Sequence, residues 1–387
     1  MPPSNVLPPS PRRSPRVLPL VTAALGAAAL LAAALVAPTP AGAVPPGVTG
    51  SASLAATATS SASTPAEPRA RGSRVASSRV GFDLVNTNSS SVLCLPLPDG
   101  EGHRVRGRLV APRAVLSGRR AVVTVNVLVH DAGTGGWFFN LRRNPTYDYA
   151  TQLAKRGQTS LVLDRLGYGR SPLKDGGDTC LGAQVHMLHQ VVQHLYGGRY
   201  DYLGTRSDST PPHASHVVLQ GHGTGATIAQ LEAARFDDVA GLVLMAPATT
   251  SPSQVALQAV GDQAGTCLDD TFAPYGATAA DFRRLLFATA PRGLRKAAVA
   301  RRNPTPCGDV ASLPGALASI TLGDRDVEMP VLVLRGGKDA RTSGGRVSIT
   351  SESTLTRRSY PRSGSALTLE KSAPKMQRAV ARWLRRL

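Results

Sequence analysis

Short, almost entirely apolar runs alternate with stretches of helical spacing, and this alternation limits the possible folds more than any other feature of the chain. Five such runs lie at residues 121–129, 160–163, 217–219, 241–245 and 331–334. Strands without a polar face are typical of a parallel sheet that is buried between helices. The pattern therefore predicts an α/β fold, a mostly parallel sheet flanked by helices, in one folded domain over residues 79–387.

The stretches around these runs predict helices, a hairpin and an insertion. Apolar residues recur at helical spacing over residues 181–196, and a basic amphipathic stretch at 377–387 is expected to be the last covering helix. Residues 91–97 and 105–110 are expected to pair as an opening hairpin, because an Asp-Gly pair between them is typical of a tight turn. The long segment at about 247–328 is expected to form a cap over the carboxyl ends of the strands, where open α/β sheets bind ligands.

The amino-terminal residues 1–43 have the pattern of an export signal. Three arginines precede an apolar run at 17–37, and small residues at 41–43 form a cleavage site. A retained membrane anchor is the competing interpretation, since the run approaches the length that spans a bilayer. Cleavage predicts a secreted protein without stable membrane insertion. A disordered linker of Ala, Ser, Thr and Pro at 44–78 would follow, because it has too few large apolar side chains to fold.

Export also bears on the cysteines, because an even number in an oxidising compartment suggests disulfides. The sequence has four, which allow three pairings: Cys94, Cys180, Cys267 and Cys307. Their order along the chain favours Cys94 with Cys180 and Cys267 with Cys307, the second pair inside the cap. Four buried free thiols are the alternative.

The formal net charge of the chain is +19. Such a surface would attract anionic cell-wall polymers, lipids or nucleic acid. No stretch interleaves aromatic with basic residues, as a base-stacking surface would, so nucleic acid is not an expected partner. A general preference for Arg and Ala accounts for the charge without any partner, while contact with an anionic cell wall stays open.

A strand, a glycine-rich turn and a helix follow one another at residues 217–234, VVLQGHGTGATIAQLEAA. The segment resembles the nucleophile elbow of the α/β-hydrolase fold family of serine esterases and lipases, in which the turn has the pattern G-x-S-x-G. Here the turn reads Gly221-His222-Gly223-Thr224-Gly225. Glycine, as Gly223, therefore stands at the nucleophile position.

Other segments resemble landmarks of this family in the expected order. The His-Asp-Ala turn at 130–132 resembles the one whose backbone N–H helps to form the oxyanion hole, and residues 162–172 resemble the loop after the next strand. VLVLRGGKDA resembles the segment that presents the triad acid, which would be Asp339. YPRSGSALTLEKSAP resembles the histidine loop, with Ser365 where the family has histidine. The resemblance covers residues 92–387.

The chemistry of this family needs a hydroxyl nucleophile, an imidazole base and a carboxylate that orients the imidazole, in the chain order nucleophile, acid, histidine. All eight histidines precede Gly223, so none can follow the acid. Thr224 would offer its backbone N–H and point its side chain elsewhere, and His222 and His130 are expected to be structural. We therefore expect no activity of the usual serine-hydrolase kind.

The resemblance has two further implications, one for Asp131 and one for Gly223. Asp131 stands where the family usually has glycine, and a carboxylate facing the site would oppose developing negative charge. The alternative is a solvated aspartate that tolerates unusual backbone angles. Gly223 adopts a left-handed backbone without the cost of a Cβ. A capped pocket is expected at this point, lined by the following residues: Asp131, Ala132, Trp137, Phe138 and Thr224.

Two histidines, His186 and His189, share a helix face, with His194 further along. No Cys, Asp or Glu lies near them at ligand spacing, so they are interpreted as a partly buried helix edge. Neither a metal nor a cofactor is expected.

These features support three hypotheses about function. The first is a catalytically degenerate pseudo-hydrolase that binds a small apolar or ester-like molecule in its capped pocket, or a protein partner. The second is an active, esterase-like hydrolase with a non-standard catalytic arrangement. The third is a basic structural protein associated with the cell wall.

Overall fold

The structure, a computed structural model, describes residues 75–122, 124–204 and 209–387. The predicted export signal at 1–43 and most of the predicted linker at 44–78 lie outside the described residues. The first strand, β1 (Val75–Val85), begins inside the segment interpreted as linker, so the folded part starts before residue 79.

Nine strands of the described residues form one large, mostly parallel sheet. After β1, the strands of this sheet are β2 (Gly102–Pro112), β3 (Thr124–Val129), β4 (Thr159–Asp164), β5 (Asp201–Leu203), β6 (His216–His222), β7 (Gly241–Met245), β11 (Val331–Gly336) and β13 (Leu355–Tyr360). Within the described residues their order is β13-β11-β7-β6-β3-β4-β2-β1-β5. The pairs from β13 to β4 are parallel. The pairs from β4 to β5 are antiparallel, so the sheet is the mostly parallel one that the sequence predicts.

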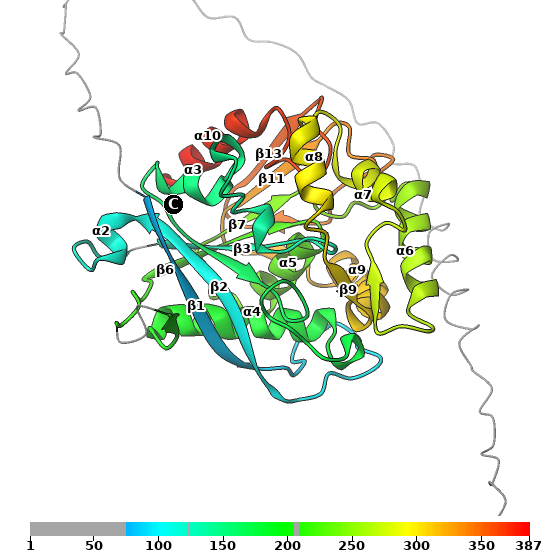
Figure 1. Cartoon of the computed structure of the whole chain (residues 1–387), viewed down its shortest axis with the longest axis horizontal. Coiled ribbons are helices and arrows are strands. Elements are labelled where there is room, and N and C mark those ends of the chain that lie inside the picture. Colours follow the sequence, from blue (N-terminus) through cyan, green and yellow to red (C-terminus); the bar gives the residue numbers. More distant parts are fainter. Residues whose placement is uncertain (1–74, 123, 205–208) are drawn as a thin grey trace, which may run out of the picture. The chain divides into compact units, whose positions relative to one another are not determined.

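Helices cover both faces of the sheet. They are α2 (Arg113–Leu116), α3 (Tyr149–Ala154), α4 (Leu181–Gly197), α5 (Thr224–Phe236), α6 (Gln254–Thr266), α7 (Ala279–Leu286), α8 (Arg292–Val299), α9 (Cys307–Leu322) and α10 (Ala373–Leu384), with 3-10 turns η1 (Gly136–Phe138), η2 (Pro145–Tyr147) and η3 (Gly176–Asp178). Figure 1 shows α3 and α10 on one side of the sheet and α4 on the other. None of the helices in the described ranges is sufficiently long and apolar to span a bilayer.

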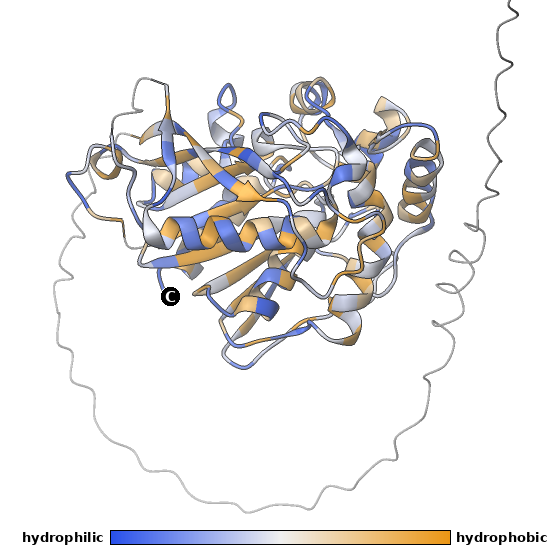
Figure 2. Ribbon diagram, turned by 90° about the horizontal axis from the view of Figure 1, so that it is seen from below, coloured by the Kyte–Doolittle hydropathy of each residue, from blue (hydrophilic) through white to orange (hydrophobic). Residues whose placement is uncertain are grey.

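The central strands are apolar because both of their faces are buried. In β11, Val331 and Val333 pack into the core on the side of α4 and α5. Leu332 and Leu334 pack into the core on the side of α3 and α10. Successive side chains of a strand point to opposite faces, so each run contributes to two cores. Figure 2 shows the resulting concentration of hydrophobic residues on the strands.

The opening hairpin differs from the predicted one. β2 pairs antiparallel with β1, from Val75 opposite Pro112 to Val85 opposite Gly102, whereas residues 91–97 form no strand. Those residues instead hold Cys94, which is joined to Cys180 at the start of α4. In β1 the buried residues alternate, but serines and an arginine interrupt the pattern at its beginning. That interruption is why the sequence does not reveal the strand.

The segment between β7 and β11 contains α6 to α9, two short strands that pair with each other, β8 (Phe272–Pro274) and β9 (Pro304–Pro306), and β10 (Asp326–Val327). β10 pairs with β12 (Thr350–Ser351) outside this segment. The second half of α9 buries Ala316 and Ile320 in the core that α4 and α5 share. This part of the insertion therefore belongs to the helical layer. α7 and α8 bury side chains in the core on the side of α3 and α10, while α6 lies beside the sheet (Figure 1).

Both disulfides have the pairing that the sequence favours. Cys94 is bonded to Cys180, and Cys267 to Cys307. The second bond joins the end of α6 to the start of α9. The alternative of four free thiols is wrong.

Candidate functional site

The glycine turn between β6 and α5 has the backbone that its sequence predicts. Gly223 has φ 55° and ψ −119°, a conformation that costs a residue with a Cβ about 1 to 3 kcal/mol. The backbone N–H of Gly223 donates to the carbonyl of Met245 at 3.1 Å. The turn is thereby attached to the end of the neighbouring strand β7.

Asp131, at the end of β3, points its carboxylate into this turn. Its Oδ1 accepts a hydrogen bond from the backbone N–H of Thr224 at 2.7 Å and another from that of Ala132 at 2.8 Å. The family resemblance assigns these two N–H groups to the oxyanion hole. The residue is 1% exposed, so its interpretation as a solvated turn aspartate is wrong. A carboxylate oxygen thus accepts both of the N–H groups that the resemblance assigns to an oxyanion.

The same carboxylate also takes the space of a nucleophile side chain. A Cβ added at Gly223 would lie within 3.0 Å of the carboxyl carbon and of both oxygens of Asp131, closer than real Cβ atoms approach other atoms. Serine at position 223 would therefore overlap Asp131. The Asp131 carboxylate therefore fills the space that the missing side chain of Gly223 leaves free.

Arg341, in the loop after β11, connects this carboxylate to the predicted triad acid. Its Nη1 donates to Asp131 Oδ2 at 2.8 Å. Its Nε and Nη2 donate to the two oxygens of Asp339, each at 3.1 Å, and Nη2 also donates to the carbonyl of Ala246 at 2.9 Å. Burial alone would raise the pKa of Asp339, but the guanidinium holds it below its ordinary value. Asp339 is thus ionised and engaged by an arginine, not by an imidazole.

Sequence reasoning missed Arg341. The one signal in the sequence is that Arg341 comes two residues after Asp339. The chain is rich in arginine, so this closeness carries little information. Tyr275, from the insertion between β7 and β11, also packs here. It contacts Arg341 and Gly133, which is close to Asp131. We call Asp131, Arg341 and Asp339 the Asp–Arg–Asp network.

The histidine position is filled by a buried serine. The hydroxyl of Ser365 donates to the carbonyl of Leu285 at 3.2 Å, and its own carbonyl accepts a hydrogen bond from His222 Nε2 at 3.0 Å. The His222 ring stacks on Phe138 with 4.3 Å between centroids. Burial lowers the pKa of His222 to about 4, so this histidine is a neutral structural group near physiological pH.

His130 is also structural. Its Nδ1 donates to the Asp131 carbonyl at 2.8 Å, and its Nε2 accepts the backbone N–H of Arg165 at 3.1 Å. Burial lowers the pKa of His130 well below its ordinary value, which agrees with this neutral tautomer. Both ring nitrogens are engaged, so His130 has no free lone pair for a base.

The predicted pocket residues do not line one common cavity. Phe138 is fully buried beneath the turn, whereas Trp137 lines a cavity of about 740 Å³ on the side of β2 and β4. The basic residues that line this cavity are five arginines: Arg108, Arg142, Arg143, Arg170 and Arg301. Asp164 lies among them, and its Oδ1 accepts the backbone N–H of Gly136 at 2.7 Å. We call this space the arginine cavity.

The three histidines of α4 have separate environments. His186 Nδ1 lies 2.9 Å from the hydroxyl of Thr87, and His194 contacts the carbonyl of Arg199. Of the three, only His189 lies near carboxylates of the described residues, those of Glu232 and Asp238. These two residues follow His189 at a long distance in sequence, which is why ligand spacing around the histidines does not reveal them.

The comparison with protein families decides the assignment of the chain. The model of the alpha/beta hydrolase family matches residues 127–385. The chain belongs to this family. The match includes the glycine turn, the Asp–Arg–Asp network and the whole insertion. No curated protein matches the chain.

Solved structures show the same fold at low identity. A thermophilic esterase from Thermogutta terrifontis is 16% identical, with 79% of this chain and 98% of that chain covered and a TM-score of 0.52. A monoacylglycerol lipase from Paleococcus ferrophilus is 18% identical, with 68% and 96% covered and a TM-score of 0.50. An esterase from Exiguobacterium antarcticum is 13% identical, with 76% and 98% covered and a TM-score of 0.50.

Proposed function

We propose that this protein is an exported member of the alpha/beta hydrolase family that has no serine-hydrolase activity and binds an anionic ligand in the arginine cavity. The observation that carries the first part is the position of Asp131. Its carboxylate accepts both N–H groups that would stabilise an oxyanion. Catalysis of acyl transfer depends on such donors being free to meet developing negative charge.

Three features of the site oppose hydrolysis. Position 223 has no hydroxyl, and the nearest imidazole, His222, has its Nε2 bonded to a carbonyl. Arg341 donates to both oxygens of Asp339, so a base would have to share this acid with the guanidinium. The Asp–Arg–Asp network joins its three side chains by charge-assisted hydrogen bonds and holds the turn in place without a substrate.

The arginine cavity supports the second part of the proposal. Its volume lies within the range of small-molecule sites, about 300 to 1,000 Å³. Among the described residues its five arginines form no ion pair within 4 Å. Burial, together with the charges of Arg170 and Arg142, lowers the pKa of Arg108. A ligand with several negative charges would relieve this repulsion, and Trp137 offers it an apolar surface.

We propose an anionic ligand in place of the apolar or ester-like ligand that is expected from the sequence. The apolar side chain expected at that pocket, Phe138, is packed against His222. Export is supported by the two disulfides, which persist in oxidising compartments. An anionic ligand is also the kind that a cell wall would offer to an exported basic protein.

Fluorophosphonate probes are expected to leave the folded protein unlabelled. These probes report an activated hydroxyl, and position 223 offers none. The measurement is intact-protein mass after incubation with excess probe, beside a serine esterase as positive control. Stoichiometric labelling of one residue that is lost on unfolding would contradict the proposed absence of a nucleophile.

An aromatic polyanion is expected to bind in the arginine cavity. The probe is pyranine, a pyrene trisulfonate, followed by fluorescence polarisation at two salt concentrations. Replacing Arg142 and Arg170 together by glutamine is expected to weaken binding roughly tenfold, because two charge-assisted contacts are lost. The matched control replaces Arg382 and Arg386, exposed on or just after α10, and is expected to bind as the parent does.

The control decides between a site and a general charge effect. Equal loss of affinity in both double variants would mean that pyranine responds only to net charge, and the proposed site would be wrong. Loss in the cavity variant alone supports the site. Quenching of Trp137 on binding, absent from Trp137→Phe, would place the probe in the cavity.

A further inference from the structure

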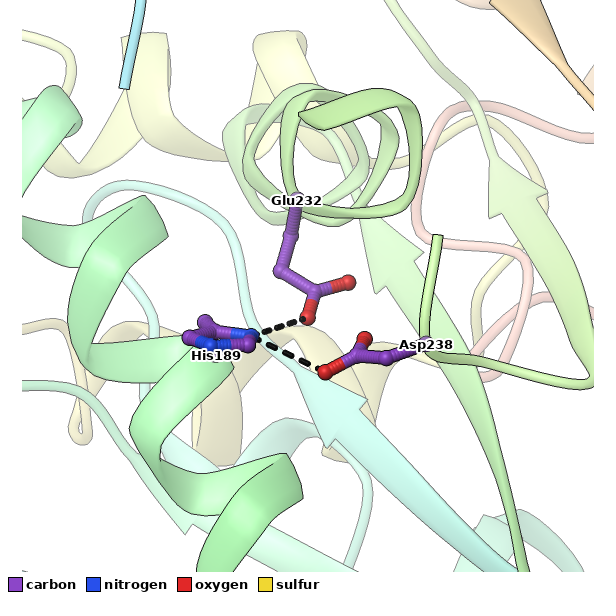
Figure 3. A group of neighbouring side chains, drawn as sticks. All are labelled: His189, Glu232 and Asp238. Carbon is purple, nitrogen blue, oxygen red and sulfur yellow. Dashed lines mark ion pairs between the residues drawn. The ribbon is translucent and has the colours of Figure 1, made fainter. Parts of the chain in front are cut away.

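A second group of polar side chains lies on the opposite side of the sheet from the arginine cavity. It joins His189 of α4, Glu232 of α5 and Asp238, just after α5 (Figure 3). His189 Nδ1 lies 2.9 Å from Asp238 Oδ2 and 3.7 Å from Glu232 Oε1. One donor atom of each residue lies within 4.8 Å of those of the other two. We call these residues the His–Glu–Asp cluster.

Glu232 is the unexplained member of this cluster. Its side chain is fully buried, and neither carboxylate oxygen accepts a hydrogen bond from a donor in the described part of the chain. His189 Nδ1 lies 3.7 Å from Glu232 Oε1, which is beyond hydrogen-bonding distance. Buried carboxylates are normally paired with a donor or coordinate a metal ion. Within the described residues Glu232 therefore has no hydrogen-bond donor of its own.

The other two side chains are held in position by their neighbours. The His189 ring stacks on Phe236 with 3.8 Å between centroids. Gln193 Nε2 donates to Asp238 Oδ2 at 2.6 Å. Such outer contacts orient ligands and are typical of metal sites. His189 and Asp238 are both partly exposed, so an ion has a path from solvent to the buried carboxylate.

We propose that His189, Glu232 and Asp238 together bind one divalent transition-metal ion, with Zn²⁺ preferred over Mg²⁺ and Ca²⁺. Zinc binds imidazole nitrogen and carboxylate oxygen at about 2.1 Å in tetrahedral geometry. This places ligand atoms about 3.4 Å apart. The separations of 2.9 and 3.7 Å lie on either side of this value. A water molecule from the exposed side would complete the four ligands.

The donor set argues for the choice of ion. Ca²⁺ takes six to eight oxygen ligands and Mg²⁺ prefers an octahedral oxygen shell, which three residues with one nitrogen do not supply. Imidazole nitrogen favours the transition metals. The ion would join α4 to α5, the helix that follows the glycine turn, so its role is structural and separate from the arginine cavity.

The test is a titration of the full, disulfide-bonded chain, stripped with EDTA, with Zn²⁺ followed by calorimetry. We expect one ion per chain and a higher melting temperature only when Zn²⁺ is present. Glu232→Gln and Asp238→Asn each remove one ligand charge and are expected to weaken Zn²⁺ binding about a hundredfold. The matched control is His186→Gln, which changes a histidine of the same helix face and is expected to bind as the parent does.

Each outcome decides the proposal. A parent chain that does not bind Zn²⁺ overturns it, as does a pair of carboxylate variants that bind Zn²⁺ as the parent does. If Glu232→Gln fails to fold, the partly exposed Asp238→Asn gives the answer alone. Tighter binding of Ca²⁺ or Mg²⁺ than of Zn²⁺ overturns the assigned preference. Equal loss of binding in His186→Gln would show that the ion lies elsewhere on α4.

Discussion

Gly223→Ser is expected to lower the free energy of unfolding by roughly 3 kcal/mol and to give no esterase activity. The added Cβ would overlap the Asp131 carboxylate, which must then move away from the N–H groups of Thr224 and Ala132. The strained backbone at Gly223 adds to the cost. The measurement is urea unfolding followed by circular dichroism, with turnover of p-nitrophenyl acetate on the folded variant.

The control for this variant is Gly261→Ser. Gly261 lies in α6, and a Cβ there would meet nothing within 4 Å, so the same substitution is expected to change stability by less than about 0.5 kcal/mol. Removing the Asp131 carboxylate is expected to restore part of the stability that Gly223→Ser loses. The double variant Asp131→Gly, Gly223→Ser is expected to lose less free energy of unfolding than the two single variants lose together. The difference is expected to be at least about 1 kcal/mol. Additive effects would contradict the steric coupling of the two residues.

Reconstruction of a triad needs more than the nucleophile and the base. Even with Gly223→Ser, Asp131→Gly and Ser365→His combined, the guanidinium of Arg341 would still bind both oxygens of Asp339. The imidazole introduced at position 365 would then compete with Arg341 for the acid. We expect esterase activity to require the replacement of Arg341 as well. The acid position thus already has a partner that an introduced imidazole would have to displace.

The sequence predicts the parallel sheet, the glycine turn and the disulfides because each leaves a local signal. Buried strands are recognisable as apolar runs, and the turn is recognisable from its closely spaced glycines. β1 is different, since its alternating apolar residues begin only at Val80, after two serines and an arginine. β1 lies beside the short edge strand β5, and exposed residues interrupt its buried ones, so its local pattern is weaker than that of a strand buried on both faces.

The arrangement of the site depends on contacts that no local pattern reveals. Asp131 and Arg341 meet only because β3 and β11 end at the same edge of the sheet. The sequence leaves open whether Asp131 faces the turn or the solvent, and its hydrogen bonds to Thr224 and Ala132 resolve the question. The sequence thus predicts which residue stands at a motif position, whereas the groups that surround that position in space are not predictable from it.

The cap is expected to depend on a buried ion pair far more than on its exposed charges. Asp309 of α9 accepts hydrogen bonds at Oδ2 from Arg165 Nη1 at 2.8 Å and from the hydroxyl of Tyr168 at 2.9 Å. The side chains of Arg165 and Asp309 are each 2% exposed. The pair joins the insertion to the loop after β4, so it fixes α9 against the sheet.

Asp309→Ala is expected to lower the free energy of unfolding by about 4 kcal/mol, because it leaves the Arg165 cation and a tyrosine hydroxyl buried without an acceptor. The control is Asp269→Ala, an exposed aspartate of the same insertion, with an expected change below about 0.5 kcal/mol. Urea unfolding at neutral pH measures both variants.

A double variant separates the cost of an unpaired charge from the loss of an attraction. Arg165→Met with Asp309→Leu removes both charges and fills similar volumes, so it is expected to recover most of the stability lost in Asp309→Ala. If the double variant is as unstable as the single one, Asp309 contributes to the free energy of unfolding through the packing of α9 and not through the buried charge. If Asp309→Ala is as stable as the parent, Arg165 reaches solvent when unpaired, and the ion pair does not hold the cap in place.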